Sequence, residues 1–117
     1  MEFNENLPIY LQIISYVEEQ ILTKHWSTEK KVPSVRELAK ELQVNPGTVQ
    51  KAYANLEQRK ILITMRGIGK QVTTDQQIIK TLRESRLEES LRLFCDEMKQ
   101  LNMEKKIVIE KIIGRQW

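Results

Sequence analysis

The chain has 117 residues, of which 40% are hydrophobic and 30% are charged, a composition that predicts one compact domain or a small domain with an appendage. The 19 basic and 16 acidic residues give a formal net charge of only +3, so the overall charge supports nucleic-acid binding weakly and has to be considered locally. No apolar run approaches the roughly 20 residues of a membrane span, the N-terminus lacks a signal-peptide pattern, and one cysteine cannot form an internal disulfide, so we expect a cytoplasmic protein without a membrane partner.

The first two predicted helices lie in the N-terminal third of the chain. Residues 8–24 are expected to form the first, with Pro8 in its first turn and a buried face made of Tyr10, Ile14, Val17 and Ile21. Residues 25–31 are polar and predict a loop. A second helix is expected to start at Ser34, because Ser34 and Glu37 form the S-x-x-E pattern of a capping box, and to end near Gln43.

A third helix and a hairpin are predicted next. Asn45 can cap this helix, and Pro46 suits its first position. Its buried face is expected to run to about Arg59 and to consist of Val49, Ala52, Tyr53 and Leu56. Two β-prone runs, residues 61–65 and 70–73, flank the glycine-containing segment 66–69 and predict a hairpin.

The C-terminal part is predicted to be a long helix over residues 75–101 and a short one over residues 107–113. The long helix carries an apolar stripe that one short helix covers poorly, so we expect symmetric dimerisation through this stripe. Packing of the stripe back onto the rest of the same chain is the alternative. The expected dimerisation residues are Leu82, Leu87, Leu91, Phe94 and Met98.

This order of elements predicts a mainly α fold with a small β-hairpin. Residues 1–74 would form a winged helix-turn-helix domain, and residues 75–117 a short C-terminal helical dimerisation segment. In a helix-turn-helix, the second helix lies in the DNA major groove and its N-terminal residues reach base edges. The helix over about residues 45–59 is therefore the expected recognition helix.

The start of this recognition helix offers groups that suit DNA. Thr48 supplies a hydroxyl, Gln50 an amide that can pair with adenine, and Lys51 a cation for phosphate or guanine. Asn45 would cap the helix and Gly47 would leave space for the DNA backbone, while the free N–H groups of the first turn favour an anion.

Two arginines outside that helix complete the expected DNA contacts. Arg66 lies at the hairpin tip, residues 66–69, where it is placed to enter a minor groove or touch the backbone. Arg36, in the first turn of the second helix, is a candidate phosphate ligand. Residues 45–72 contain five basic residues and one acid, a net +4, so the positive charge is concentrated in this segment.

Two other functional classes fit the sequence less well. A winged-helix protein–protein interaction module is the alternative, but it requires exposed apolar anchors, and residues 45–72 offer none that the sequence identifies. An enzyme is disfavoured, because His25 and Cys95 are the only histidine and cysteine and no Walker or Rossmann glycine pattern occurs. We therefore expect no metal and no cofactor, and Cys95 is predicted to be a core residue.

The segments PIYLQIISYVEEQIL, VPSVRELAKELQVNPGTVQKAYANLE and RGIGKQV resemble the N-terminal domain of GntR-family transcription regulators, and the short C-terminal part resembles their YtrA-type subfamily. The resemblance covers Pro8 to Val72. It implies a dimeric regulator, most simply a repressor, on double-stranded operator DNA whose two half-sites lie one helical turn (~10 bp) or a multiple apart. The residues implied at the DNA are Arg36, Asn45, Gly47, Thr48, Gln50, Lys51, Arg66 and Gly67.

Three positions depart from the family pattern. The loop over residues 25–31 contains no glycine, Lys60 stands where a glycine usually follows the third helix, and Gln71 stands where the wing usually has an aromatic residue. The third helix must therefore end in a different way.

Overall fold

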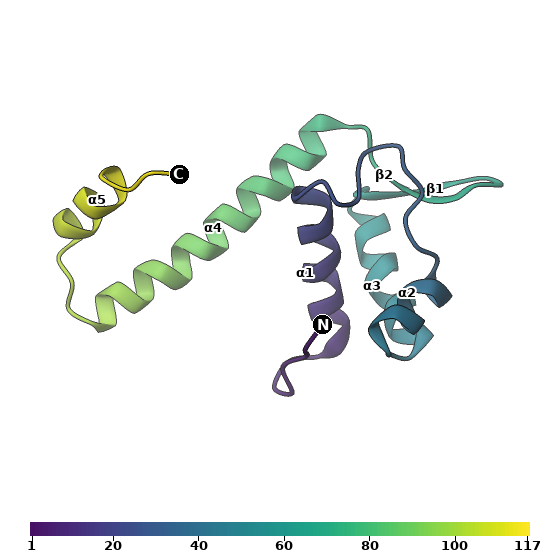
Figure 1. The fold of residues 1–117 in the computed structure, drawn as a ribbon, viewed down its shortest axis with the longest axis horizontal. Coiled ribbons are helices and arrows are strands. Elements are labelled where there is room, and N and C mark those ends of the chain that lie inside the picture. Colours follow the sequence, from purple (N-terminus) through teal and green to yellow (C-terminus); the bar gives the residue numbers. More distant parts are fainter. The chain divides into compact units, whose positions relative to one another are not determined.

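The structure, a computed structural model, describes residues 1–117 as five helices and one two-stranded antiparallel sheet (Figure 1). In chain order the elements are α1 (Ile9–Leu22), α2 (Val35–Leu42), α3 (Pro46–Gln58), β1 (Leu62–Met65), β2 (Gly69–Val72), α4 (Gln76–Gln100) and α5 (Lys105–Ile113). The predicted fold class, mainly helical with a small hairpin, is confirmed.

The chain folds as two compact units, residues 1–82 and 83–117, and α4 contributes to both. The boundary lies after Leu82 rather than after residue 74, because Ile79 and Leu82 are buried in the core of the N-terminal unit. Leu82 is only 4% exposed, so its predicted role in dimerisation is wrong: its side chain already packs inside its own chain.

α1 supplies one wall of the core in the N-terminal unit. Its predicted buried face is confirmed for Ile14, Val17 and Ile21, while Ile13, which the helical spacing did not single out, is completely buried. Tyr10 is half-buried at the edge of the core rather than inside it. Because Pro8 precedes the helix in an extended conformation, it acts as the N-cap and not as a first-turn residue.

α2 begins with the expected capping box. The Ser34 hydroxyl accepts a hydrogen bond from the Glu37 N–H at 3.1 Å, and the Glu37 carboxylate accepts one from the Ser34 N–H at 2.9 Å. These hydrogen bonds lower the pKa of Glu37. The helix ends at Gln43, which adopts the left-handed conformation with φ 58°, and the chain turns sharply into α3.

α3 crosses the middle of the N-terminal unit, and its predicted buried face is confirmed. The four residues are completely buried, and they are Val49, Ala52, Tyr53 and Leu56. The Tyr53 hydroxyl donates a 2.7 Å hydrogen bond to the Pro33 carbonyl, which ties α3 to the segment before α2. Burial raises the pKa of Tyr53 far above its usual range, so this hydroxyl stays a donor.

Residues other than glycine adopt positive φ in the loop after α1 and at the end of α3, the two segments in which the resemblance led us to expect glycine. After α3, Lys60 adopts φ 62°, and the Ile61 N–H then reaches the Leu56 carbonyl at 2.9 Å. In the loop after α1, Lys24 and Glu29 adopt φ 65° and φ 70°. An L side chain is strained at such φ values.

The hairpin forms a short wing. Leu62 pairs with Val72 and Met65 with Gly69, so residues 66–68 make the turn. Gly67 and Gly69 have φ 79° and 115°, which supports the prediction that this turn needs positive φ. An isolated bridge between Lys31 and Gln71 adds a third backbone segment beside β2.

The C-terminal unit has no core of its own. α5 buries no residue, and the only buried residues of α4 are Ile79 and Leu82, which belong to the N-terminal unit. Cys95 is exposed, so the prediction of a core cysteine is wrong for the single chain.

Candidate nucleic-acid interface

The start of α3 has the predicted cap. The Asn45 side-chain oxygen accepts a 2.7 Å hydrogen bond from the Gly47 N–H, and Pro46 occupies the first helical position. A Cβ at Gly47 would lie 3.1 Å from that oxygen, so a larger residue at this position would crowd the cap. The N–H groups of Gly47 and Thr48 both bond to Asn45, which leaves fewer free donors for an anion than the sequence suggested.

The predicted contact residues of α3 lie on its accessible side. Gln50 and Lys51 are exposed and Thr48 is half-buried, whereas Val49 between them is completely buried. The Gln50 amide makes no hydrogen bond within the protein. Its donors and acceptor are therefore free to pair with a base edge.

Lys51 has an aromatic partner that the sequence did not reveal. Its ammonium nitrogen lies 3.8 Å from the centroid of the Tyr10 ring, close enough for a cation–π interaction between α3 and α1. No carboxylate forms an ion pair with Lys51. Its full charge is thus available to a phosphate.

The wing is tied to α3 through Glu57. The Lys70 ammonium lies 2.6 Å from the Glu57 carboxylate, and the Thr64 hydroxyl donates to the same carboxylate at 3.0 Å. Burial on its own would raise the pKa of Glu57, but the hydrogen bonds from Lys70 and Thr64 outweigh it and lower that pKa. One acid therefore connects both strands of the hairpin to the recognition helix.

These ion pairs revise the local charge. Arg59, at the end of α3, forms a 2.9 Å ion pair with Glu18 of α1, and Lys70 is paired with Glu57. Of the five basic residues of segment 45–72, three have no carboxylate partner, and they are Lys51, Lys60 and Arg66. The concentration of positive charge is real but smaller than the net +4 of the segment indicates.

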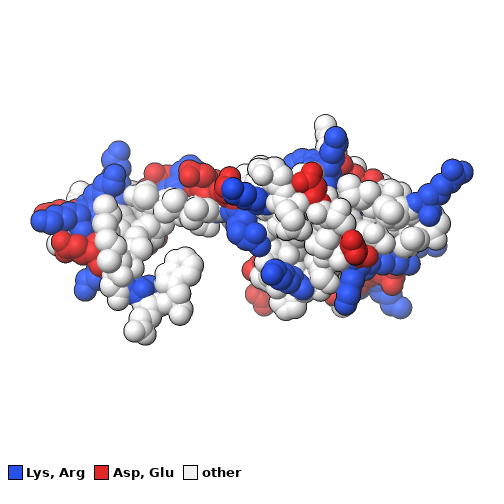
Figure 2. All heavy atoms as spheres, turned by 90° about the horizontal axis from the view of Figure 1, so that it is seen from above, with Lys and Arg blue, Asp and Glu red and all other residues white.

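The wing tip is exposed and carries apolar as well as basic side chains. Arg66 and Gly67 are both exposed, and Figure 2 shows basic side chains at the far end of the N-terminal unit, toward which the hairpin extends. Ile68 is 52% exposed, and Met65 is 39% exposed. The expectation that this segment has no exposed apolar side chain is therefore wrong, because the hairpin projects beyond the core.

Arg36 is exposed in the first turn of α2, as a phosphate ligand requires. α2 packs against α3, so Arg36 lies on the helix next to the recognition helix. Three residues that lie beside the predicted DNA contacts were not identified as part of this surface from the sequence, and they are Tyr10, Glu57 and Ile68. Only Ile68 had a local signal, since it lies between two glycines at a hairpin tip.

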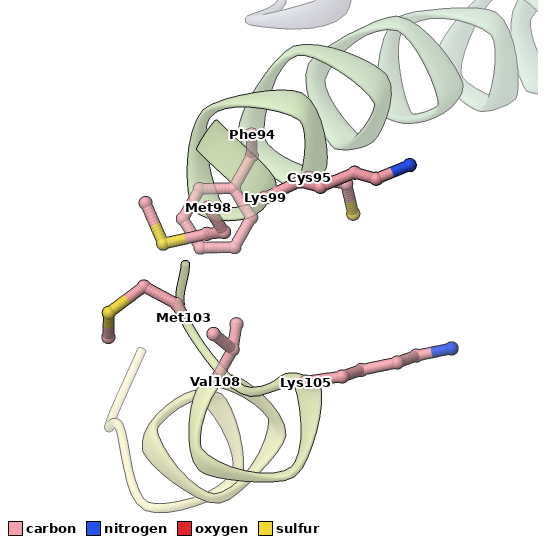
Figure 3. A pocket seen from close by; sticks show the side chains of 7 residues that line it. All are labelled: Phe94, Cys95, Met98, Lys99, Met103, Lys105 and Val108. Carbon is pink, nitrogen blue, oxygen red and sulfur yellow. The ribbon is translucent and has the colours of Figure 1, made fainter. Parts of the chain in front are cut away.

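The C-terminal unit presents apolar side chains instead. Leu87, Leu91 and Phe94 of α4 are exposed and Met98 is half-buried, so these four predicted dimerisation residues remain accessible. Between the end of α4 and α5 lies a hollow of about 310 Å³ (Figure 3). Its lining residues are Phe94, Cys95, Met98, Lys99, Met103, Lys105 and Val108.

Two further findings concern sites of other kinds. None of the helices is both long enough and apolar enough to cross a membrane. No group of three or more histidine, cysteine or acidic side chains is arranged so that it could hold a metal ion.

Comparisons with a family model and with known proteins find similar sequences. The family described as bacterial regulatory proteins, gntR family, matches residues 9–72. The chain is 34% identical to the HTH-type transcriptional regulator YhcF of Bacillus subtilis over 111 residues, 95% of this chain and 92% of that protein. It is 36% identical to the HTH-type transcriptional repressor YtrA of the same organism over 94 residues, 80% of this chain and 68% of that protein.

A solved structure matches nearly the whole chain. A GntR family transcriptional regulator from Listeria monocytogenes superposes with a TM-score of 0.86 at 38% identity, covering 97% of this chain and all of that one (100%). The matched proteins are transcription regulators and not enzymes, which confirms the prediction of a protein without catalytic activity.

Proposed function

Because the chain belongs to the GntR family of bacterial regulatory proteins and is a DNA-binding transcription regulator, we propose that it represses transcription as a dimer on a pseudo-palindromic operator. In this proposal α3 lies in the major groove, and residues 66–69 of the wing lie at the minor groove or the backbone. The DNA-binding part is the N-terminal unit, which ends at Leu82, and the remainder of the chain serves dimerisation.

The observation that carries the proposal is the exposed start of α3. Asn45 and Pro46 begin the helix sharply, and Val49 anchors it in the core. Gln50 and Lys51 then project from this helix, the Gln50 amide without a hydrogen bond in the protein and the Lys51 ammonium without a carboxylate partner. Such a pair suits one base-reading contact next to one phosphate contact.

The wing adds a second contact region at a defined distance from α3. The bonds that Glu57 makes with Lys70 and Thr64 hold the hairpin against the recognition helix. Arg66 at the tip is unpaired and therefore suits the negative potential of a minor groove or a phosphate.

Dimerisation through the C-terminal unit is supported by its unburied apolar side chains. Leu87, Leu91 and Phe94 of α4 are exposed, and α5 adds Ile109, Ile112 and Ile113, which are exposed as well. So many exposed apolar side chains on two short segments are unusual for a surface that faces water, and typically mark a contact with another surface. We propose that a second copy of the chain covers it in a symmetric arrangement, with Leu87, Leu91, Phe94 and Met98 in the contact.

Repression is the proposed direction of regulation. Its support is the similarity to YtrA of Bacillus subtilis, which is named a transcriptional repressor. A dimer bound across a promoter would block access of the transcription machinery without any further activity. The proposed place of action is the cytoplasm, where bacterial DNA is found.

Methylation protection on a bound site tests this proposal. Sites would first be selected from random double-stranded DNA with the purified protein, and the bound complex would be treated with dimethyl sulfate. This reagent attacks guanine N7 in the major groove and adenine N3 in the minor groove, the same atoms that proteins use as acceptors.

The expected pattern is two protected stretches of guanine N7 related by dyad symmetry, each accompanied by protected adenine N3 where the wing lies. Failure to select any sequence would favour the protein-interaction alternative, for which exposed Met65 and Ile68 would be the apolar anchors. Protection confined to the minor groove would contradict the role of α3.

A further inference from the structure

We infer that Tyr10 of α1 is a positioning residue for DNA binding, because it holds the ammonium group of Lys51 at the recognition helix where a phosphate can reach it. The inference rests on the proposed function, in which Lys51 contacts DNA. It adds α1, a helix outside the helix-turn-helix, to the DNA-binding apparatus.

The contact itself is short and connects two rigid elements. The Lys51 nitrogen lies 3.8 Å from the Tyr10 ring centroid, inside the range in which a cation is attracted by the ring quadrupole. Tyr10 is half-buried and packs against the hydrophobic core, so its ring is fixed in place. Lys51 is exposed, and no carboxylate forms an ion pair with its ammonium group.

An aromatic partner differs from an acidic one in its effect on DNA binding. Arg59 and Lys70 are held by Glu18 and Glu57, and these carboxylates neutralise the charges that they position. The Tyr10 ring is neutral, so it orients Lys51 and leaves its charge intact. A phosphate can bind this ammonium without displacing a competing anion.

Orientation matters because lysine is flexible. A free lysine side chain loses much of its rotamer freedom when it is held in one geometry, and this loss opposes binding. If Tyr10 already restricts Lys51 in the free protein, less freedom is lost when DNA binds. The Tyr10 hydroxyl makes no hydrogen bond within the chain, which leaves the ring face as the functional part.

A double-mutant cycle tests the inference. Binding of a fluorescein-labelled mixed-sequence DNA duplex would be measured by anisotropy for the wild type, Tyr10→Phe, Tyr10→Leu, Lys51→Ala and the double variant Tyr10→Leu/Lys51→Ala. A mixed sequence suffices, because phosphate contacts dominate binding that is not sequence-specific. Thermal unfolding of each variant would separate effects on stability from effects on DNA.

We expect Tyr10→Phe to bind like the wild type and Tyr10→Leu to bind more weakly, by roughly two- to fivefold for each protomer that contacts the DNA, the factor that an exposed cation–π contact supports. In the Lys51→Ala background, Tyr10→Leu should have no further effect. Equal loss in both backgrounds, or tighter binding by Tyr10→Leu, would overturn the inference; tighter binding would mean that the ring withholds Lys51 from DNA.

A measurement on the wild-type protein keeps the test valid even if Tyr10→Leu folds poorly. The ring current of Tyr10 should shift the ε-methylene protons of Lys51 upfield in NMR spectra, both before and after DNA is added. Loss of this shift in the complex would overturn the inference. If Lys51→Ala itself binds DNA as the wild type does, the proposed role of Lys51 fails; if only the Tyr10 variants are silent, the proposed function stands without this inference.

Discussion

DNA binding should respond differently when each of two arginines of the DNA-binding region is replaced by alanine. Arg66 is exposed at the wing tip without a carboxylate partner, whereas Arg59 lies 2.9 Å from the Glu18 carboxylate. Both substitutions remove one positive charge from segment 45–72, so charge counting predicts equal effects. The structure predicts that only Arg66→Ala changes the salt dependence of DNA binding.

The expected magnitude follows from counterion release. Each phosphate contact contributes about 0.9 to the slope of log affinity against log salt concentration, so a dimer that lacks both Arg66 side chains loses about 1.8. Between about 50 and 200 mM salt, the wild type should therefore lose roughly 12-fold more affinity than the variant does. Arg59→Ala should keep the wild-type slope, although loss of its ion pair lowers stability.

The assay is fluorescence anisotropy of a labelled duplex at several salt concentrations, at a temperature at which every variant is folded. Lys80→Ala is a matched control, since Lys80 is an exposed cation of α4, outside the helix-turn-helix and the wing. An unchanged slope for Arg66→Ala, or an equal decrease for Arg59→Ala, would refute the argument that ion pairing decides which cations meet DNA.

Three further predictions concern stability and assembly. Lys60→Gly should raise the free energy of unfolding in urea by about 0.5–1 kcal/mol, because φ 62° is strained for lysine and natural for glycine; an unchanged or lower value would contradict this strain. The Glu57 carboxylate has a lowered pKa, so its stabilisation is present above its unfolded-state pKa of about 4.3 and disappears as the pH falls through the lower folded-state value. Glu57→Gln should thus be less stable than the wild type at neutral pH by up to about 1 kcal/mol, and urea unfolding should show the difference shrinking as the pH falls below the unfolded-state pKa and vanishing once the folded carboxyl is protonated; a gap that persists in acid would exclude the contact with Lys70 as its cause. Leu91→Asp should yield monomers in light scattering, while Ser85→Asp, the same charge on the polar side of α4, should remain dimeric; a dimer that survives Leu91→Asp would move the interface elsewhere.

The elements of the fold were predictable because their signals are local. The capping box of Ser34 and Glu37, and the cap and first-turn pair Asn45 and Pro46, mark the starts of α2 and α3, and both are formed. The wing followed from two glycines with positive φ between β-prone runs. Each of these features depends on residues within a few positions of one another.

The features that could not be predicted depend on contacts between residues far apart in the sequence. Arg59 and Glu18 are 41 positions apart, and no local pattern indicates that they meet. The stripe of α4 looks continuous in sequence, but its first part, Ile79 and Leu82, packs in the N-terminal core while the part from Leu87 onward stays exposed. Helical periodicity shows which residues share a face, not which surface that face meets.

The same limit applies to the DNA-contact residues. Their types and positions near the start of α3 were predictable, since a helix start and its exposed side follow from the pattern of caps and buried residues. Which of the cations remain free to contact DNA could not be predicted, because the partners lie on other elements. Glu57 forms an ion pair with Lys70, and the Tyr10 ring contacts Lys51. Pairing across the fold decides the local charge.

The most direct measurement of the central claim, that α3 reads bases in the major groove, is selection of bound sites from random DNA with the wild type and Gln50→Ala in parallel. Gln50 is exposed with its amide unpaired, so its loss should weaken the preference at one base pair in each half-site, by about 1–3 kcal/mol, and leave the other positions unchanged. Identical preferences for the two proteins at every position of the site would contradict the claim.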